Sequence, residues 1–344
     1  MVMRLEPGEE NPRNSEGDFI QLESGRILFV YTRFTSGAGD HASAHLVSRF
    51  SDDQGKTWSS EDVLVIPNEG TMNVMSVSML RLSDGRIALF YLRKNSVTDC
   101  IPFMRISTDE AKSWSDPVRC IDTTAYFVLN NDRVRQLKNG RIILPVAMHP
   151  ASENGIVSNA QIRCYFSDDQ GKTWQKGRTV KNENNVTLQE PGICELANGN
   201  LLLYCRTNKG VQYFSHSKDM GENWTPVTPG NIKSPLSPAS IERIPETGDL
   251  LLVWNNNSTD EKRTPFTLAV SNDEGKSWTN LKTIENNPDG WYCYTAIEFV
   301  DEYVLLGHCA GNRIQNNGLE TTQITRLHLD WIYNQPEADS LRVE

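Results

Sequence analysis

Basic clusters, long apolar runs and a leader-like start are all absent from this sequence of 344 residues. The formal net charge is −10, and without a block of lysine and arginine the chain lacks the surface on which nucleic-acid binding depends. No stretch approaches the roughly 18 apolar residues of a membrane-spanning helix. The start, MVMRLEPGEENPRN, has neither a basic nor an apolar region. A cytoplasmic location is therefore expected, with a periplasmic or secreted one left open if a signal has been removed.

Disulfide frameworks and metal-ligand patterns are also missing. The seven cysteines are odd in number and lie mostly in apolar runs, which predicts buried free thiols. His41, His45 and His149 are scattered without the spacing of metal ligands, so neither a metal nor another cofactor is expected. Helix signals are almost absent as well, and an all-β fold is the class that remains.

Repetition is what the sequence does contain. A box of eight residues, Ser-x-Asp-x-Gly-x-(Thr/Ser/Asn)-Trp, occurs five times, and only the second copy departs from it, with Ala111 in place of glycine. The copies begin at Ser51, Ser107, Ser167, Ser217 and Ser271. Because Ser and Asp side chains can bond backbone amides in a tight turn and Trp can pack on a flank, the boxes are predicted to be structural.

A second repeat lies between the boxes: two short apolar runs joined by a polar turn, in most copies with a glycine, the pattern of a β-hairpin. The six copies span 19–33, 78–93, 133–147, 192–206, 239–254 and 295–309. A period of roughly 50 to 60 residues is typical of propeller blades. We therefore expect one domain over 1–344, a six-bladed β-propeller of four-stranded antiparallel blades. The sixth blade lacks a strand, and residues 1–6 are expected to supply it and close the ring.

Boxes and hairpins together resemble the bacterial sialidase superfamily, whose members are six-bladed propellers with repeated Asp-boxes. The resemblance covers nearly the whole chain. It implies a glycoside hydrolase whose partner is a glycan or glycoconjugate. Boxes also occur in β proteins without this activity, so the functional residues have to be matched one by one.

Three residues match the catalytic positions of that superfamily. Asp40 lies eleven residues before Ser51, where the acid/base stands. Glu190 precedes the fourth hairpin, as the carboxylate that polarises the nucleophile does, and Tyr294 opens the sixth hairpin, as the nucleophile does. A phenol attacks poorly until a neighbouring carboxylate takes its proton, so Glu190 is the expected base for Tyr294. A solvated loop position for Asp40 and a core position for Tyr294 are the structural alternatives.

Two arginines match positions that hold the substrate carboxylate. Arg206 follows Glu190 by sixteen residues, and Arg263 precedes Ser271 by eight. Since a hairpin brings both of its ends to the same rim, Glu190 and Arg206 are expected to be neighbours, whether as site residues or as a structural salt bridge.

The chain departs from the superfamily at its first blade. The aromatic-Arg-Ile-Pro motif that carries a third arginine is replaced by Asn14-Ser15-Glu16-Gly17-Asp18. Arg13 or Arg133 is a candidate substitute, whereas the acidic pair in the replaced motif would instead suit a polyhydroxylated sugar. Ser76 stands where the superfamily has an aspartate, which predicts a substrate with altered decoration.

Three further residues are predicted to line the site. Arg33 and Arg93 close the first two hairpins at the position where Arg206 closes the fourth. Tyr292 is the rival of Tyr294 as nucleophile, and strand alternation places the two on one face, so that one attacks and the other forms a wall.

The predicted function is that of a retaining exo-α-glycosidase which removes a terminal sialic acid or related acidic sugar. Two alternatives stay open. One is a propeller of the same fold that acts on a different, non-sialic glycan. The other is a glycan-binding module without catalysis.

Overall fold

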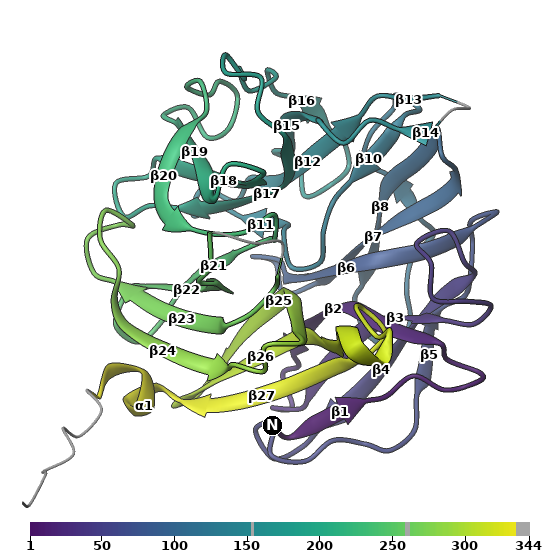
Figure 1. Ribbon diagram of the computed structural model, residues 1–344. Coiled ribbons are helices and arrows are strands. Elements are labelled where there is room, and N and C mark those ends of the chain that lie inside the picture. Colours follow the sequence, from purple (N-terminus) through teal and green to yellow (C-terminus); the bar gives the residue numbers. More distant parts are fainter. Residues whose placement is uncertain (153–154, 259–261, 335–344) are drawn as a thin grey trace, which may run out of the picture.

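Antiparallel strands form nearly all regular structure in the computed structural model, which describes residues 1–152, 155–258 and 262–334 (Figure 1). β-branched and aromatic residues separated by glycine turns favour strands over helices throughout. Within the described residues, helical turns are limited to η1 (Arg313–Gln315) and α1 (Leu329–Tyr333). None of these helical segments is long and apolar enough to cross a membrane.

Three sheets have four strands that follow one another along the chain. The first sheet contains β2 (Arg13–Gln21), β3 (Ile27–Phe34), β4 (Ala44–Ser51) and β5 (Val63–Ile66). Another contains β17 (Leu188–Glu195), β18 (Leu201–Thr207), β19 (Val211–Ser217) and β20 (Thr228–Lys233). The third contains β21 (Ser240–Arg243), β22 (Leu250–Asn255), β23 (Phe266–Ser271) and β24 (Thr279–Glu285).

The second and third repeats share one nine-stranded sheet. The second repeat contributes β6 (Asn73–Arg81), β7 (Ile87–Ser96), β8 (Asp99–Ser107) and β9 (Val118–Arg119). The third contributes β10 (Tyr126–Val128), β11 (Arg135–Gln136), β12 (Ile142–His149), β15 (Gln161–Ser167) and β16 (Gln175–Lys176). A single parallel pairing, Tyr126 with Cys100, joins the two halves. A small ribbon of β13 (Ala151–Ser152) and β14 (Gly155–Ile156) stands apart.

The last sheet recruits the beginning of the chain. Its strands are β25 (Gly290–Val300), β26 (Tyr303–Asn312), β27 (Thr322–His328) and β1 (Met3–Leu5). β1 pairs with β27 in antiparallel register, from Met3 opposite Ile324 to Leu5 opposite Thr322. The expectation that the N-terminal residues complete the sixth repeat is confirmed.

The six predicted hairpins are all present, each as an antiparallel pair of successive strands. Five of them turn at a glycine with φ between 78° and 91°, a region that residues with a Cβ atom rarely adopt. These are Gly25, Gly85, Gly140, Gly199 and Gly248. Local turn chemistry therefore specifies where each hairpin folds back.

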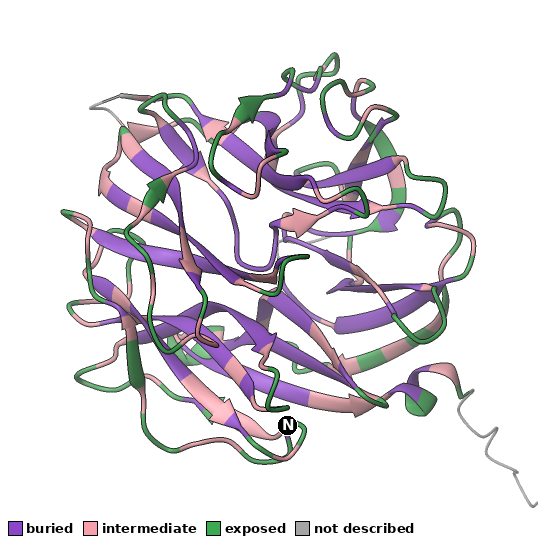
Figure 2. Cartoon of the chain, turned by 180° about the vertical axis from the view of Figure 1, so that it is seen from behind, coloured by how far each residue is buried: buried purple, intermediate pink, exposed green. Residues whose placement is uncertain are grey.

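The first strand of each hairpin lies toward the middle of the molecule (Figure 1). β2 contacts β6 and β25, and β21 contacts β17 and β25. The segment 130–134 of the third repeat crosses between them: Asn131 Nδ2 donates to the carbonyls of both Gly17 and Tyr294. Buried residues follow the strands and exposed ones the connecting loops (Figure 2). All seven cysteines are buried and free, as predicted.

The repeated boxes are hydrogen-bonded turns. In the first, Ser51 Oγ donates to Asp53 Oδ1 at 2.8 Å and accepts from Gly55 N at 2.9 Å, while Asp53 accepts from Thr57 N. The other four boxes repeat this pattern, with Ala111 N in the place of the glycine amide in the second. These bonds satisfy the turns internally, which supports the prediction of a structural role.

Four carboxyl groups gather around Arg135 at the centre. Its guanidinium lies 2.8 Å from Asp132 Oδ1 and 2.6 Å from Glu242 Oε2. Asp18 accepts hydrogen bonds from Met79 N and Phe19 N. Burial, with the charges of Asp132 and Glu242, raises the pKa of Glu298 to about 8. Arg135 therefore pairs with two of the carboxyl groups, and Glu298 is exposed to the charges of both.

We expect Glu298→Gln to stabilise the protein at pH 8 and to leave its stability unchanged near pH 4. The folded state holds the Glu298 proton more tightly than the unfolded chain, so wild-type stability falls as pH rises from the ordinary carboxyl pKa of 4.5 to about 8, where the loss is complete. The loss reaches about 1.4 kcal/mol for each pH unit between the two pKa values. Urea unfolding at both pH values measures this, with Glu9→Gln on the surface as the control. Equal stabilisation at both pH values would contradict the assignment.

Candidate active site

Five residues near the centre adopt a left-handed backbone, which residues with a side chain rarely take. They are Glu16, Ser76, Asp132, Glu190 and Tyr294, with φ between 49° and 60°. In β2, β6, β17 and β25 the strand register shifts at these positions, as in a β-bulge. Such a residue costs about 1–3 kcal/mol, and strain of this kind clusters at functional sites.

Four of the five left-handed residues line one small cavity of about 80 Å³, called the inner cavity. Its walls are Glu16, Asp40, Met75, Ser76, Leu92, Lys94, Tyr126, Val128, Asn130, Glu190 and Tyr294. Asp40 also lines a larger outer pocket of about 460 Å³. The two spaces therefore meet at this carboxylate.

Tyr294 and Glu190 form a hydrogen-bonded pair within the inner cavity. Tyr294 Oη donates to Glu190 Oε1 at 3.1 Å, and Arg206 Nη1 lies 2.9 Å from Glu190 Oε2. Burial, followed by the charge of Glu190, raises the pKa of Tyr294. The phenol is therefore protonated at rest, with its proton directed at a carboxylate that can accept it.

Arg263 is a buried cation between the inner cavity and the outer pocket. Its Cζ lies 5.4 Å from the ring centre of Tyr294 and 4.9 Å from that of Trp291. Within the described residues, Nε and Nη1 of Arg263 have no hydrogen-bond partner. Buried guanidinium donors without acceptors are well suited to an anionic ligand.

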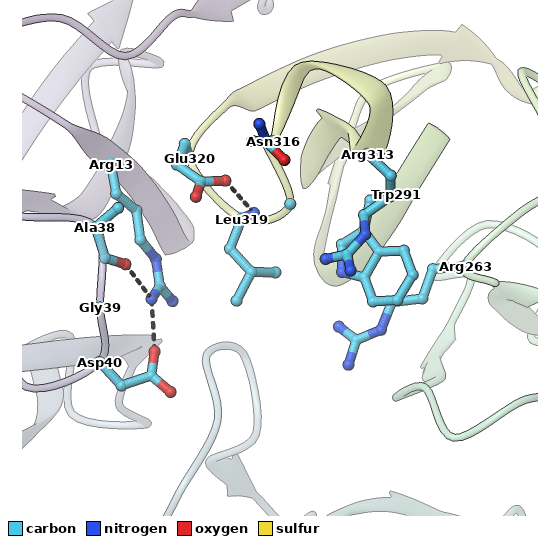
Figure 3. A pocket seen from close by; sticks show the side chains of 11 residues that line it. Arg13, Ala38, Gly39, Asp40, Arg263, Trp291, Arg313, Asn316, Leu319 and Glu320 are labelled. Carbon is cyan, nitrogen blue, oxygen red and sulfur yellow. Dashed lines mark hydrogen bonds and ion pairs between the residues drawn. The ribbon is translucent and has the colours of Figure 1, made fainter. Parts of the chain in front are cut away.

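Arg13 forms an ion pair with the carboxylate of Asp40 (Figure 3). Arg13 Nη1 donates to Asp40 Oδ1 at 2.5 Å and Nη2 to Glu16 Oε1 at 2.8 Å. Burial acts to raise the pKa of Asp40, but the charge and hydrogen bond of Arg13 lower it below its ordinary value. The charges of Lys94 and His41 add to the lowering, and 58% of the Asp40 side chain is exposed.

The outer pocket has cations on both sides. Arg13 and Asp40 lie on one side, and Arg263, Trp291 and Arg313 on the other (Figure 3). The Cζ of Arg313 lies 4.5 Å from the ring centre of Trp291. Ala38, Gly39, Asn316, Gly318, Leu319 and Glu320 complete the walls. No group of three or more His, Cys, Asp or Glu within the described ranges is arranged to hold a metal ion.

A family model for the BNR repeat-like domain matches residues 34–304, most of the chain. The chain belongs to the BNR-repeat family. Its sialidase relatives support the predicted membership of the bacterial sialidase superfamily. A sialidase of Bacteroides fragilis (strain YCH46) is 29% identical over 210 residues, which cover 56% of this chain and 36% of that protein. A sialidase of Micromonospora viridifaciens is 25% identical over 309 residues, which cover 79% of this chain and 46% of that protein. The chain thus spans less than half the length of these two relatives.

Solved structures share the fold of this BNR-repeat chain. The intramolecular trans-sialidase of Ruminococcus gnavus, in complex with oseltamivir carboxylate, matches with a TM-score of 0.75 at 15% identity, and 98% of each chain is covered. A protein of unknown function from Dyadobacter fermentans DSM 18053 matches with a TM-score of 0.76 at 18% identity, covering 95% of this chain and 98% of that one. At such identities the likeness concerns the fold.

Most of the predicted site residues of the BNR-repeat chain come together. Asp40, Ser76, Glu190 and Tyr294 line the inner cavity, and Arg206 forms an ion pair with Glu190, the expected neighbour. Arg13 and Arg263 share the outer pocket, beside Asp40.

Tyr292 lies elsewhere than predicted. It packs in the core with its ring centre 5.8 Å from that of Phe266, whereas Tyr294 lines the inner cavity. The expectation that the two tyrosines share a face is wrong, because the left-handed residue at 294 interrupts the alternation of the strand.

Three arginines make contacts other than those expected of pocket residues. Arg33 Nε lies 3.4 Å from Asp62 Oδ2, and the Cζ of Arg93 lies 3.8 Å from the ring centre of Phe103. Arg133 is buried and donates to Ala239 O at 2.7 Å. The strand position that Arg33 and Arg93 share did not determine their side-chain contacts, since a carboxylate and a ring nearby offered other partners.

Sequence reasoning missed Lys94, Trp291 and Arg313. Lys94 follows Arg93, and strand alternation points the two side chains to opposite faces of the sheet. Predicting that Arg93 lines the site therefore excluded Lys94. Trp291 stood beside Tyr292 in a run of aromatics, which was a usable signal. Arg313 lies on the connection after β26, where no repeat fixed its place.

Proposed function

We propose that this chain is a retaining exo-α-glycoside hydrolase that removes a terminal sialic acid or related acidic sugar from a glycan. The observation that carries the proposal is the hydrogen bond of 3.1 Å from Tyr294 Oη to Glu190 Oε1, in a cavity that Asp40 also lines. A nucleophile, its base and an acid thus surround one space. The sialidase relatives support the same reaction class.

We further propose that the sheets form a six-bladed propeller and a single domain over residues 1–344. Six hairpins, their contacting inner strands and the pairing of β1 with β27 support a closed ring. A propeller opens its inner strands onto one axis, which accounts for five left-handed residues gathering from five repeats.

In the first half of the reaction, Tyr294 Oη attacks the anomeric carbon while Glu190 takes the phenolic proton. Asp40 gives its carboxyl proton to the glycosidic oxygen, and the bond from that oxygen to the anomeric carbon breaks. The aglycone leaves as an alcohol, and the sugar is joined to Tyr294. A neutral phenol approaches an anionic sugar without the repulsion that a carboxylate nucleophile would meet.

In the second half, Asp40 takes a proton from water, whose oxygen attacks the anomeric carbon. The bond to Tyr294 breaks, and Glu190 returns its proton to the phenolate. Two displacements on opposite faces leave the anomeric configuration retained.

The resting pair of Arg13 and Asp40 suits the second half more than the first. Arg13 holds the pKa of Asp40 low, which favours the carboxylate that activates water. An anionic substrate that draws on the charge of Arg13 would weaken this pair and allow Asp40 to carry the proton required in the first half.

A second candidate is a sialidase-fold enzyme for a different glycan. It is favoured by the fact that Arg13 is already neutralised by Asp40 and Glu16. Arg263 then remains as the cation whose Nε and Nη1 lack partners within the described residues. A non-catalytic glycan-binding propeller is the third possibility, but a lectin has no need of a tyrosine bonded to a carboxylate.

The test is hydrolysis of 4-methylumbelliferyl α-glycosides of sialic acid, Kdn and Kdo by the full chain, beside the galactoside and glucoside. We expect release from at least one acidic conjugate, with the α-anomer formed first in proton NMR. Release from a neutral glycoside alone would support the second candidate. Binding on a glycan array without hydrolysis of any conjugate would overturn the enzyme proposal.

A further inference from the structure

A buried lysine lines the wall of the inner cavity without forming an ion pair to any described residue. Lys94 lies near the end of β7 and is only 2% exposed. Its Nζ donates to the backbone carbonyl of Asp40 at 2.8 Å and lies 3.4 Å from Met75 Sδ. It also lies 5.4 Å from the ring centre of Tyr126. Burying an ammonium group is costly, so its retention at this place calls for a role.

The residue opposite Lys94 binds the same loop. Asn73 is the register partner of Lys94 across β6 and β7. Its Nδ2 donates to the carbonyls of Asp40 at 2.9 Å and Ala42 at 2.8 Å. The loop between β3 and β4 contains Gly37 and Gly39 just before Asp40, which leaves its backbone more freedom than other residues would. Arg13 Nη1 donates to Ala38 O and Ala42 N to Gly39 O, but neither bond reaches the carbonyl of Asp40. Two buried side chains therefore converge on one carbonyl, that of the proposed acid/base.

We propose that Lys94 is a positioning residue that fixes Asp40 over the cavity and supplies it with a constant positive charge. This inference rests on the proposed function, because it concerns the acid/base of that reaction. Lys94 needs no contact with the substrate, since it acts through its hydrogen bond to the backbone carbonyl of Asp40 and through the effect of its charge on the Asp40 carboxyl group.

Other ionisable groups surround Asp40 and set the background against which Lys94 acts. In the inner cavity these are Glu16 of β2, Tyr126 of β10, Glu190 of β17 and Tyr294 of β25. In the outer pocket they are Arg13, Arg263, Arg313 and Glu320. His41 follows in the loop, and Cys100 is the register partner of Lys94 on β8. Arg13 has the larger effect on the Asp40 pKa, and Lys94 adds to the lowering.

A comparison of two substrates with different leaving groups distinguishes a positioning role of Lys94 from a structural one. An alkyl alcohol leaves only with a proton from Asp40, whereas umbelliferone is acidic enough to leave with little help. We expect Lys94→Met to lower kcat/KM for sialyllactose by on the order of 10²-fold and for the methylumbelliferyl conjugate by less than about 10-fold. Lys94→Arg should recover most of the loss on the alkyl glycoside, and Lys56→Met, on the surface, should change neither.

The pH profile gives a second, independent readout. Removal of a positive charge raises the pKa of Asp40, so the basic limb of kcat/KM in Lys94→Met should move to higher pH, and in Lys94→Arg it should stay. Equal losses on both substrates with an unmoved limb would overturn the inference while leaving the proposed function intact. A wild-type chain inactive on every conjugate would instead overturn the proposed function. Circular dichroism of the Lys94→Met chain shows whether a loss of activity is due to a failure to fold. If Lys94→Met does not fold, Lys94→Gln takes its place, and full activity of Lys94→Gln with an unshifted basic limb of its pH profile would also count against a positioning role.

Discussion

Tyr294→Phe is expected to lower kcat/KM for release of the acidic sugar by on the order of 10⁶-fold, the scale of the loss when a nucleophilic serine is deleted. The substitution removes only the hydroxyl group, which donates a hydrogen bond of 3.1 Å to Glu190 Oε1. It leaves the ring beside Arg263, so the fold and the binding of the sugar are retained. Steady-state kinetics on the methylumbelliferyl conjugate measure the loss. The same change at Tyr213, in the core of β19, is the matched control and should leave activity unchanged.

Covalent trapping distinguishes loss of a nucleophile from loss of a wall residue. A 2,3-difluoro analogue of the acidic sugar forms a slowly hydrolysed bond with the attacking residue, and peptide mass spectrometry locates it. We expect the label on Tyr294 in the wild-type chain and no label in Tyr294→Phe. A label on Asp40, or undiminished turnover in Tyr294→Phe, would be incompatible with tyrosine as nucleophile.

Arg263→Gln is expected to lower kcat/KM for an acidic sugar by about 30- to 3000-fold, as for loss of one partner of a buried charge pair. Most of this loss should appear in KM, because the guanidinium binds the anion in the ground state as well as in the transition state. Arg263→Lys should recover little, since an ammonium cannot offer two parallel donors. The exposed pair of Arg26 with Asp52 provides the control, Arg26→Gln, which should have no effect.

Binding of the free acidic sugar, measured by calorimetry, complements the kinetics of Arg263→Gln. The affinity of the wild-type chain for the acid should exceed that for its methyl ester, and this preference should disappear in Arg263→Gln. An unchanged preference would assign the carboxylate to another cation, Arg13 or Arg313, in the same pocket.

The fold was largely predictable because its instructions are local. A glycine with positive φ forms the turn of five of the hairpins. In each box the Ser and Asp side chains accept hydrogen bonds from backbone amides four residues further along the chain. Such signals act over a few residues and repeat along the chain. The pairing of β1 with β27 followed from counting strands, since the sixth repeat was one short.

The site was predictable where it follows hairpin geometry and not where it follows the bulges. Glu190 and Arg206 meet because they flank one hairpin. Tyr292 was placed on the wrong face because the alternation of side chains along a strand is interrupted by the left-handed residue at 294. Lys94 was missed because alternation alone does not say which face of a sheet lines a cavity. Arg13 was only one of two candidates, since its approach to Asp40 depends on the loop between β3 and β4.

The strand β1 is synthesised before its partner β27, and the other five repeats are made in between. At typical elongation rates, roughly 15–60 s separate the two on the ribosome. During that time β1 lacks its partner, and a strand with unpaired amides can pair with another chain. Crowded expression therefore favours exchange of β1 between nascent chains, and slower initiation should increase the yield of monomer.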